Sequence, residues 1–134
     1  MKFLLDTNIV SRLVRSPDDE DLRDRITEVG ESRVCTSIVV AAELRYGAEK
    51  KKSPRLSAQL HAVLRAMEIA PFEVPADTTY GQIRARLEYL GTPIGANDLL
   101  IAAQVITLGY TLVTDNEREF GRIAGLKCEN WLRD

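Results

Sequence analysis

Two aspartates directly follow short apolar segments of the chain. Asp6 comes after Phe3–Leu5, and Asp115 comes after Leu112–Thr114. If both segments are strands of a parallel α/β sheet, their carboxyl ends meet in one crevice, where such sheets bind ligands. Either aspartate alone is equally consistent with capping the helix that follows it. Together they predict an acidic site at one edge of a sheet.

Two further acids, Glu43 and Asp98, lie on apolar faces of expected helices. Their neighbours at helical spacing are Val39, Val40 and Tyr46 for Glu43, and Ile101, Ala102 and Val105 for Asp98. No Lys or Arg stands one turn away on either face. Because a buried, unpaired carboxylate is costly, each group must be protonated, paired with a distant arginine or bound to a metal.

Four carboxylates brought to one sheet edge repel each other unless a cation neutralises them. Oxygen ligands select hard cations such as Mg²⁺ or Mn²⁺ over zinc. Polar side chains at neighbouring positions are expected to orient ligands or hold water: Thr7, Asn8, Ser37, Thr114, Asn116 and Glu119. Whether Asp115, Asn116 or Glu119 completes the metal shell remains open at this point.

Other catalytic schemes find little support in the sequence. His61 is the only histidine, which disfavours a zinc-hydrolase pair or a Ser-His-Asp triad, and a surface or half-buried place is expected for it. There is no glycine-rich phosphate loop. Trp131 is expected to anchor the C-terminal segment.

The elements that must position these residues alternate between strand and helix. Strands are predicted at Lys2–Leu5, Arg33–Thr36, Glu68–Val74, Thr111–Thr114 and Cys128–Trp131. Helices are predicted at Thr7–Arg15, from an Asp18 N-cap to Val29, and at Ser37–Lys52, Pro54–Met67, Asp77–Leu90, Asn97–Leu108 and Glu117–Arg122. This alternation predicts an α/β sandwich with a mostly parallel central sheet, in a single domain spanning residues 1–134.

Length and composition agree with one soluble domain: 134 residues, 45% of them hydrophobic and 28% charged. No apolar run approaches a membrane span, and two cysteines suit a reduced, cytoplasmic location. The net charge of −2 argues mildly against nucleic-acid binding. Without the four site acids, however, 16 acidic residues face 18 basic ones, so the charge balance does not exclude nucleic-acid binding.

Four segments carry a family resemblance: FLLDTN, SIVVAAELRYGAEK, GTPIGANDLLIAA and LVTDNEREF. In this order and at these separations, from Phe3 to Trp131, they resemble the PIN-domain family and, within it, the VapC toxins of type II toxin–antitoxin modules. The resemblance implies a PIN-like α/β/α sandwich. It places the family's acidic residues on Asp6, Glu43, Asp98 and the Asp115/Asn116/Glu119 region.

The resemblance also implies a Mg²⁺- or Mn²⁺-dependent endoribonuclease that cuts structured RNA, with initiator tRNA, cut in the anticodon loop, as the leading substrate. Asp6 and Asp98 are expected to hold the principal ion, and Glu43 with Asp115 to complete its shell or hold a second one. Water attack would leave 5′-phosphate and 3′-hydroxyl ends. RNA contacts are expected from basic residues around the crevice: Arg12, Arg15, Lys50, Lys51, Lys52, Arg55, Arg84 and Arg86.

The implied partners are a VapB-like antitoxin, in a toxin–antitoxin hetero-oligomer, and a second copy of the chain. The apolar stripe of Thr7–Val14 or the helix around Leu56–Leu64 is expected to supply the homodimer surface. Two other classes compete with the nuclease. A receiver domain needs an acidic pair at the first strand and a lysine at the end of the late strand, whereas only Asp6 stands at the first strand and no lysine directly follows Thr111–Thr114. A catalytically silent RNA- or protein-binding module on the same scaffold predicts missing site acids, yet all are present.

Overall fold

The computed structural model describes residues 1–132 of the chain, whose five strands form one parallel sheet. The strand order is β3-β2-β1-β4-β5. The strands are β1 (Phe3–Leu5), β2 (Val34–Ser37), β3 (Glu68–Ala70), β4 (Thr111–Val113) and β5 (Cys128–Glu129). The predicted α/β class with a parallel central sheet is therefore confirmed, with most strands shorter than the apolar pattern suggested.

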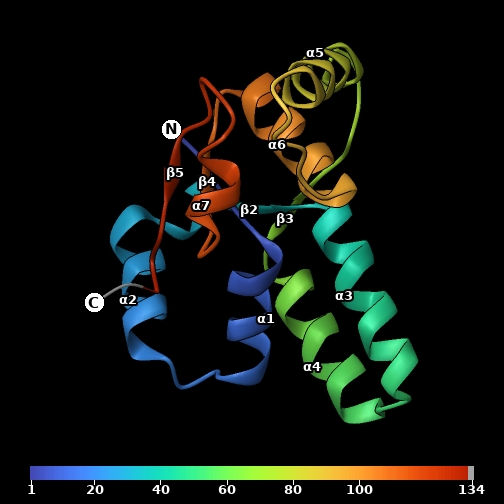
Figure 1. Ribbon diagram of the computed structural model, residues 1–134. Helices are drawn as coiled ribbons and strands as arrows, with labels where there is room; N and C mark the ends of the chain where they lie inside the picture. Colours follow the sequence, from blue (N-terminus) through green and yellow to red (C-terminus); the bar gives the residue numbers. More distant parts are fainter. Residues whose placement is uncertain (133–134) are drawn as a thin grey trace.

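Helices cover both faces of the sheet, as a sandwich requires (Figure 1). They are α1 (Thr7–Arg15), α2 (Glu20–Val29), α3 (Ile38–Lys51), α4 (Pro54–Arg65), α5 (Ala76–Tyr89), α6 (Ala96–Leu108) and α7 (Glu117–Phe120). From β1 the chain moves outward to β3 through α1–α4, and then returns past β1 to β4 and β5 through α5–α7. Because parallel crossovers are right-handed, this reversal puts α1–α4 on one face and α5–α7 on the other.

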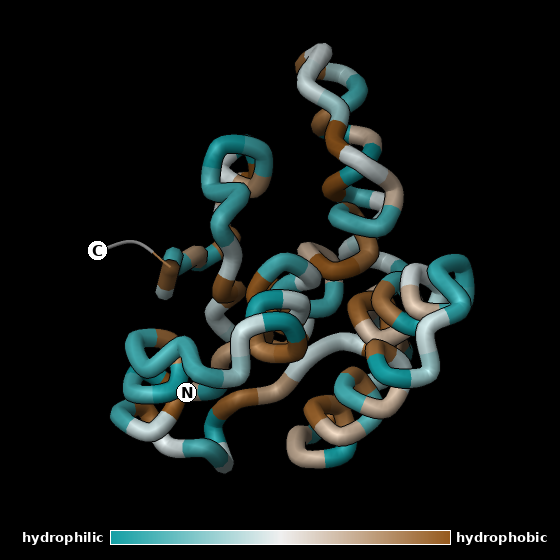
Figure 2. Tube along the Cα trace, turned by 90° about the horizontal axis from the view of Figure 1, so that it is seen from below, coloured by the Kyte–Doolittle hydropathy of each residue, from teal (hydrophilic) through white to brown (hydrophobic). Residues whose placement is uncertain are grey.

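The core lies between the sheet and the inward faces of the helices, and Figure 2 shows hydrophobic residues concentrated towards the middle of the molecule. Two apolar stripes that the sequence offered as dimer surfaces belong to this core. On α1 the buried residues are Ile9, Val10, Leu13 and Val14, and on α4 they are Leu60 and Leu64. The prediction that the α1 stripe supplies a dimer surface is wrong, because the chain covers these side chains itself. The helix around Leu56–Leu64 stays a predicted dimer surface, since Leu56 and Val63 are only half-buried.

Several element ends differ from the prediction for local reasons. Asp19, and not Asp18, caps α2, because Pro17 and Asp18 form a turn and the Asp19 carboxylate accepts from the amide of Leu22 at 3.1 Å. A 3₁₀ turn, η1 (Glu31–Arg33), takes up Arg33, so β2 begins one residue later. The last strand ends at Glu129, and not at Trp131.

Other predictions about single residues are confirmed. Ser53 caps α4 ahead of Pro54. Trp131 is buried, with its ring centroid 5.2 Å from that of Phe3, and anchors the C-terminal segment. His61 is exposed. Within residues 1–132, no helix combines the length and apolarity that crossing a bilayer would need.

Candidate active site

The site lies where the direction of the crossovers reverses, between β1 and β4. Residues that follow two adjacent parallel strands at such a switch point face one crevice. Asp6 follows β1 and Thr114 follows β4, and the Thr114 hydroxyl donates to Asp6 Oδ2 at 2.8 Å. The predicted convergence of these two strand ends is therefore confirmed.

Asp6 is buried with half of its carboxylate unpaired. Its side chain accepts no capping hydrogen bond in α1, and it is 4% exposed. Among the described residues, Asp6 Oδ1 has no hydrogen-bond partner. Burial raises the pKa of Asp6, the Thr114 hydroxyl and the Thr7 amide oppose this rise, and the charges of Glu43 and Asp115 add to it. A buried acceptor of this kind calls for a proton or a cation.

Asp98 enters the same crevice from the first turn of α6. Burial comes first among the causes that raise its pKa to about 7, followed by the hydrogen-bonded Glu119 and the negative charges of Asp6 and Glu43. These causes show that the acids from four separate segments act on one another. No ion pair with Lys or Arg reaches Asp6, Glu43 or Asp98 in the part of the chain that the structure describes.

Glu43 reaches the site from α3 and is half-buried. The hydroxyl of Thr7, the first residue of α1, donates to Glu43 Oε1 at 3.0 Å. The sequence assigned Thr7 a supporting place, and the structure puts it between the helices that follow β1 and β2. Asp6, Glu43, Asp98 and Glu119 are called the acidic cluster below.

The three residues that could complete the metal shell, Asp115, Asn116 and Glu119, differ in their surroundings. Glu119 lies beside Asp98 and accepts from the Gly95 amide at 3.1 Å, a contact that lowers the pKa of Glu119. Asn116 donates from Nδ2 to Glu119 at 3.3 Å, and its amide donates to Thr114 Oγ1. Asp115 is exposed and accepts from Asn8 Nδ2 at 2.9 Å. Glu119 is thus the acid of this segment that contacts Asp98.

A neutral network borders the acidic cluster, and sequence reasoning missed its central residue. Gln104 on α6 is 1% exposed and donates from Nε2 to the carbonyls of Ala70 and Pro71, both at 2.8 Å. Its Oε1 accepts from Ser37 Oγ, and this hydroxyl also accepts from the amide of Val39 to cap α3. A single amide within the apolar segment Asn97–Leu108 was the available signal. Ser37, Gln104 and the two carbonyls are called the amide network below.

The residues present fit a hard divalent cation held by few protein ligands. No three Asp, Glu, His or Cys side chains among residues 1–132 lie close enough to hold an ion among themselves. Mg²⁺, however, keeps several waters and takes one or two carboxylates from the protein. The unpaired, buried Asp6 Oδ1 is an oxygen donor of this type, and Asp98 is near enough for the two charges to interact.

The predicted RNA-contact residues fall into two groups. Arg12 pairs with Asp19 at 2.9 Å, and Arg84 pairs with Glu88 at the same distance. The remaining residues are exposed on the outer surfaces of α1, α3, α4 and α5 and the α3–α4 junction: Arg15, Lys50, Lys51, Lys52, Arg55 and Arg86. Of these, Lys50 lies over the ring of Tyr46, with Nζ 6.0 Å from the ring centroid.

Comparison with known proteins identifies the family. The model of the PIN domain matches residues 3–126. The chain is 38% identical over 132 residues, 98% of each chain, to the tRNA(fMet)-specific endonuclease VapC of Salmonella typhimurium, and equally to Ribonuclease VapC2 of Rickettsia felis.

Solved structures agree. The VapBC2 complex of Rickettsia felis bound to a promoter DNA fragment contains a chain that matches with a TM-score of 0.91 and 36% identity, over 98% of this chain and 99% of that one. The DNA-bound VapBC complex of Salmonella typhimurium contains one with a TM-score of 0.87 and 37% identity, over 98% of each. The chain therefore belongs to the PIN-domain family and, within it, to the VapC ribonucleases.

Proposed function

We propose that this chain is the toxin of a type II toxin–antitoxin pair and acts as a Mg²⁺- or Mn²⁺-dependent endoribonuclease. The observation that carries the proposal is the buried Asp6 carboxylate with an unpaired Oδ1, next to Asp98 at the switch point of the sheet. A silent binding module would not need to keep buried acids without counter-charges, because each such group lowers stability. The acidic cluster therefore favours catalysis.

Asp6 and Asp98 would hold the ion, which supplies Lewis-acid activation of water and neutralises charge that develops on the phosphate. The chain's other residues fix these carboxylates before RNA binds. Thr114 orients Asp6, Thr7 orients Glu43, and Glu119 contacts Asp98 from a position held by the Gly95 amide. Preorganised oxygens of this kind need little rearrangement during the reaction.

Initiator tRNA, cut in the anticodon loop, is the proposed substrate. The support is the 38% identity, over nearly the full length of both chains, to a relative named as a tRNA(fMet)-specific endonuclease. A water nucleophile leaves a 5′-phosphate and a 3′-hydroxyl on the cut RNA. Loss of initiator tRNA would stop translation, which fits a toxin.

A VapB-like antitoxin is the proposed protein partner, in a hetero-oligomer that contains two copies of this chain. The supporting neighbours are VapBC complexes, two of them bound to DNA. An antitoxin segment with a basic side chain near Asp6 and Asp98 would satisfy the same uncompensated charges that a metal ion does.

The test is cleavage of purified tRNA by the chain in Mg²⁺, in EDTA and after Mg²⁺ is restored. We expect cleavage to depend on the metal, and Asp98→Asn to lose it. Asp77→Asn, which changes an exposed aspartate on α5, is the matched control and should cleave normally. Activity that survives both EDTA and Asp98→Asn would refute the metal-dependent nuclease.

The substrate is tested separately by comparing initiator and elongator methionine tRNA and mapping the new 5′ ends. Preferential cleavage of initiator tRNA in its anticodon loop supports the assignment. Equal cleavage of both tRNAs, or cuts outside the anticodon loop, would refute initiator tRNA as the specific substrate without refuting the ribonuclease activity.

A further inference from the structure

A hollow of about 460 Å³ adjoins the acidic cluster between α3 and the first turns of α6. Its lining includes Ile38, Ala42, Glu43, Tyr46, Asn97 and Leu100. Glu43 also belongs to the acidic cluster, so the hollow borders the site. We call it the Tyr46 shelf.

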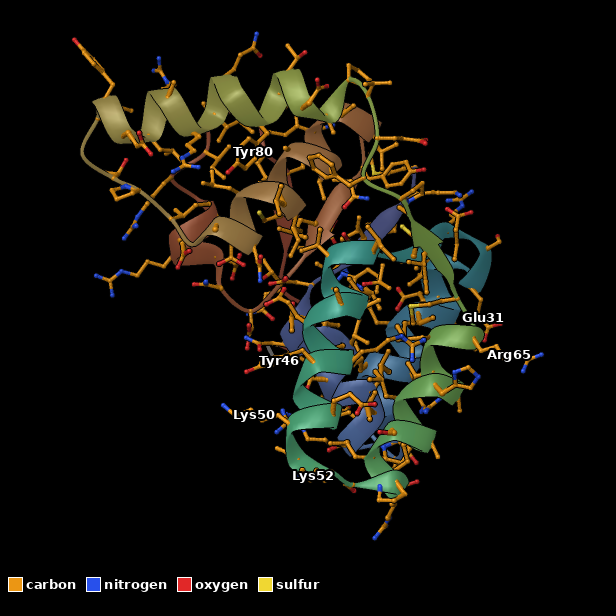
Figure 3. All side chains as sticks on the ribbon, turned by 90° about the vertical axis from the view of Figure 1, so that its right-hand side faces the viewer. Glu31, Tyr46, Lys50, Lys52, Arg65 and Tyr80 are labelled. Atoms are coloured by element: carbon orange, nitrogen blue, oxygen red, sulfur yellow. The ribbon has the colours of Figure 1, made fainter. Side chains whose placement is uncertain are left out.

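The Tyr46 shelf exposes apolar and aromatic surface beside positive charge. Tyr46 is 66% exposed and Ile38 is 46% exposed. Figure 3 shows Tyr46 and Lys50 on the same outward side of α3, with Lys52 at its end. The Lys50 ammonium lies 6.0 Å from the centroid of the Tyr46 ring. Exposed aromatic rings flanked by cations are the usual platform for unpaired nucleobases.

We propose that the Tyr46 shelf binds an unpaired nucleobase of the RNA next to the scissile phosphate. Tyr46 stacks on the base, Asn97 offers its amide to the base edge, and Lys50 pairs with a neighbouring phosphate. The inference rests on the proposed ribonuclease function and extends it: the enzyme takes RNA whose base beside the cut is unstacked. Single-stranded loops present such bases, and regular duplexes do not.

Charge favours RNA over a second copy of the chain on this surface. The basic end of α3 contains Lys50, Lys51 and Lys52, and none of them forms an ion pair within the described residues. A two-fold contact through this surface would bring like charges together, whereas phosphates neutralise them.

The test asks whether the aromatic ring of Tyr46 is needed, or only an apolar side chain. It compares tRNA cleavage by Tyr46→Leu, which loses the ring, and by Tyr46→Phe, which keeps it. We expect Tyr46→Leu to raise KM about tenfold with kcat unchanged, because it keeps apolar volume and loses the stacking face. Tyr46→Phe should retain the wild-type KM. Lys50→Gln should raise KM and reduce the salt dependence of binding by about one counterion. Tyr89→Leu, on another largely exposed tyrosine, is the matched control and should change nothing.

Direct contact between Tyr46 and a base is measured by the fluorescence of 2-aminopurine. The analogue is placed beside the mapped cut in an RNA oligonucleotide that is bound to the inactive Asp6→Asn chain. Quenching that disappears with Tyr46→Leu supports stacking. If Tyr46→Leu cleaves tRNA with the wild-type KM, the Tyr46 shelf does not bind a nucleobase, and the proposed ribonuclease function is unaffected. If the wild-type chain cleaves no RNA, both the proposed ribonuclease function and the nucleobase site are refuted. Sedimentation showing that Tyr46→Leu converts a dimer to a monomer would instead assign this surface to a second copy.

Discussion

The acidic cluster and the amide network lie next to each other at one end of the sheet. Both contain a buried polar side chain, but they differ in whether its polar atoms have hydrogen-bond partners. Gln104 is 1% exposed, and both its amide nitrogen and its amide oxygen have partners. Asp6 is 4% exposed, yet one of its carboxylate oxygens has none within the described residues. Two side chains that are almost fully buried therefore differ: the polar groups of Gln104 are all paired, and one oxygen of Asp6 is not.

This difference separates stability from function. A buried amide with all its partners fixes α6 against β2 and the segment after β3, and removing it leaves several polar groups unpaired. Buried acids without counter-charges oppose folding and are retained where they bind something positive. The amide network should therefore govern stability, and the acidic cluster should govern catalysis and metal binding.

The largest expected effect is the loss of cleavage in Asp6→Asn. The substitution keeps the shape of the side chain and removes the charge that would hold the cation, so we expect kcat/KM to fall by at least about 10³, on the order of 4 kcal/mol. Thermal unfolding should show no loss of stability. A kcat/KM within about tenfold of wild type would contradict the assignment of catalysis to the acidic cluster.

Gln104→Leu should show the opposite result. It removes the acceptor of the Ser37 hydroxyl proton and the side-chain donor to the carbonyls of Ala70 and Pro71, which we expect to lower the free energy of unfolding by about 2–4 kcal/mol. Cleavage per folded molecule, measured well below the Tm, should stay within about threefold. Thr107→Val removes a half-buried hydrogen bond between α6 and α5 and, as the control, should cost only about 1 kcal/mol.

Mg²⁺ should stabilise the wild type through the acidic cluster. At about ten times its dissociation constant, a cation that binds only the folded chain adds about 1.4 kcal/mol. Calorimetry should show a rise in Tm that Gln104→Leu retains and Asp6→Asn loses. An equal rise in Asp6→Asn would place the cation elsewhere.

The smallest effect is a pH dependence in metal-free protein. Because the folded chain raises the pKa of Asp98 to about 7, its carboxylate destabilises the fold above that pH, and this loss disappears as the pH falls from 7 towards 4. Solvent screening reduces the effect to on the order of 1 kcal/mol. Asp98→Asn should therefore unfold at a higher temperature than wild type at pH 8 in EDTA, with the difference vanishing near pH 4.

The sequence by itself determined the architecture and three of the clustered acids. Strand and helix periods are local properties, so alternation along the chain was enough to predict a parallel α/β sheet. Asp6, Glu43 and Asp98 were identifiable because a carboxylate at a strand end or on an apolar helix face conflicts with its surroundings. Local turn chemistry was harder to predict, as the cap at Asp19 in place of Asp18 illustrates.

Only the tertiary structure decided which polar groups meet. Gln104 finds its partners 33 to 67 positions away along the chain, and no sequence period reports such pairings. Glu119, rather than Asp115, contacts Asp98, because α7 turns it towards the start of α6. The apolar stripe of α1 became core, while Tyr46 stayed exposed beside the site. Spacing predicts which face a residue occupies, but packing alone decides what covers that face.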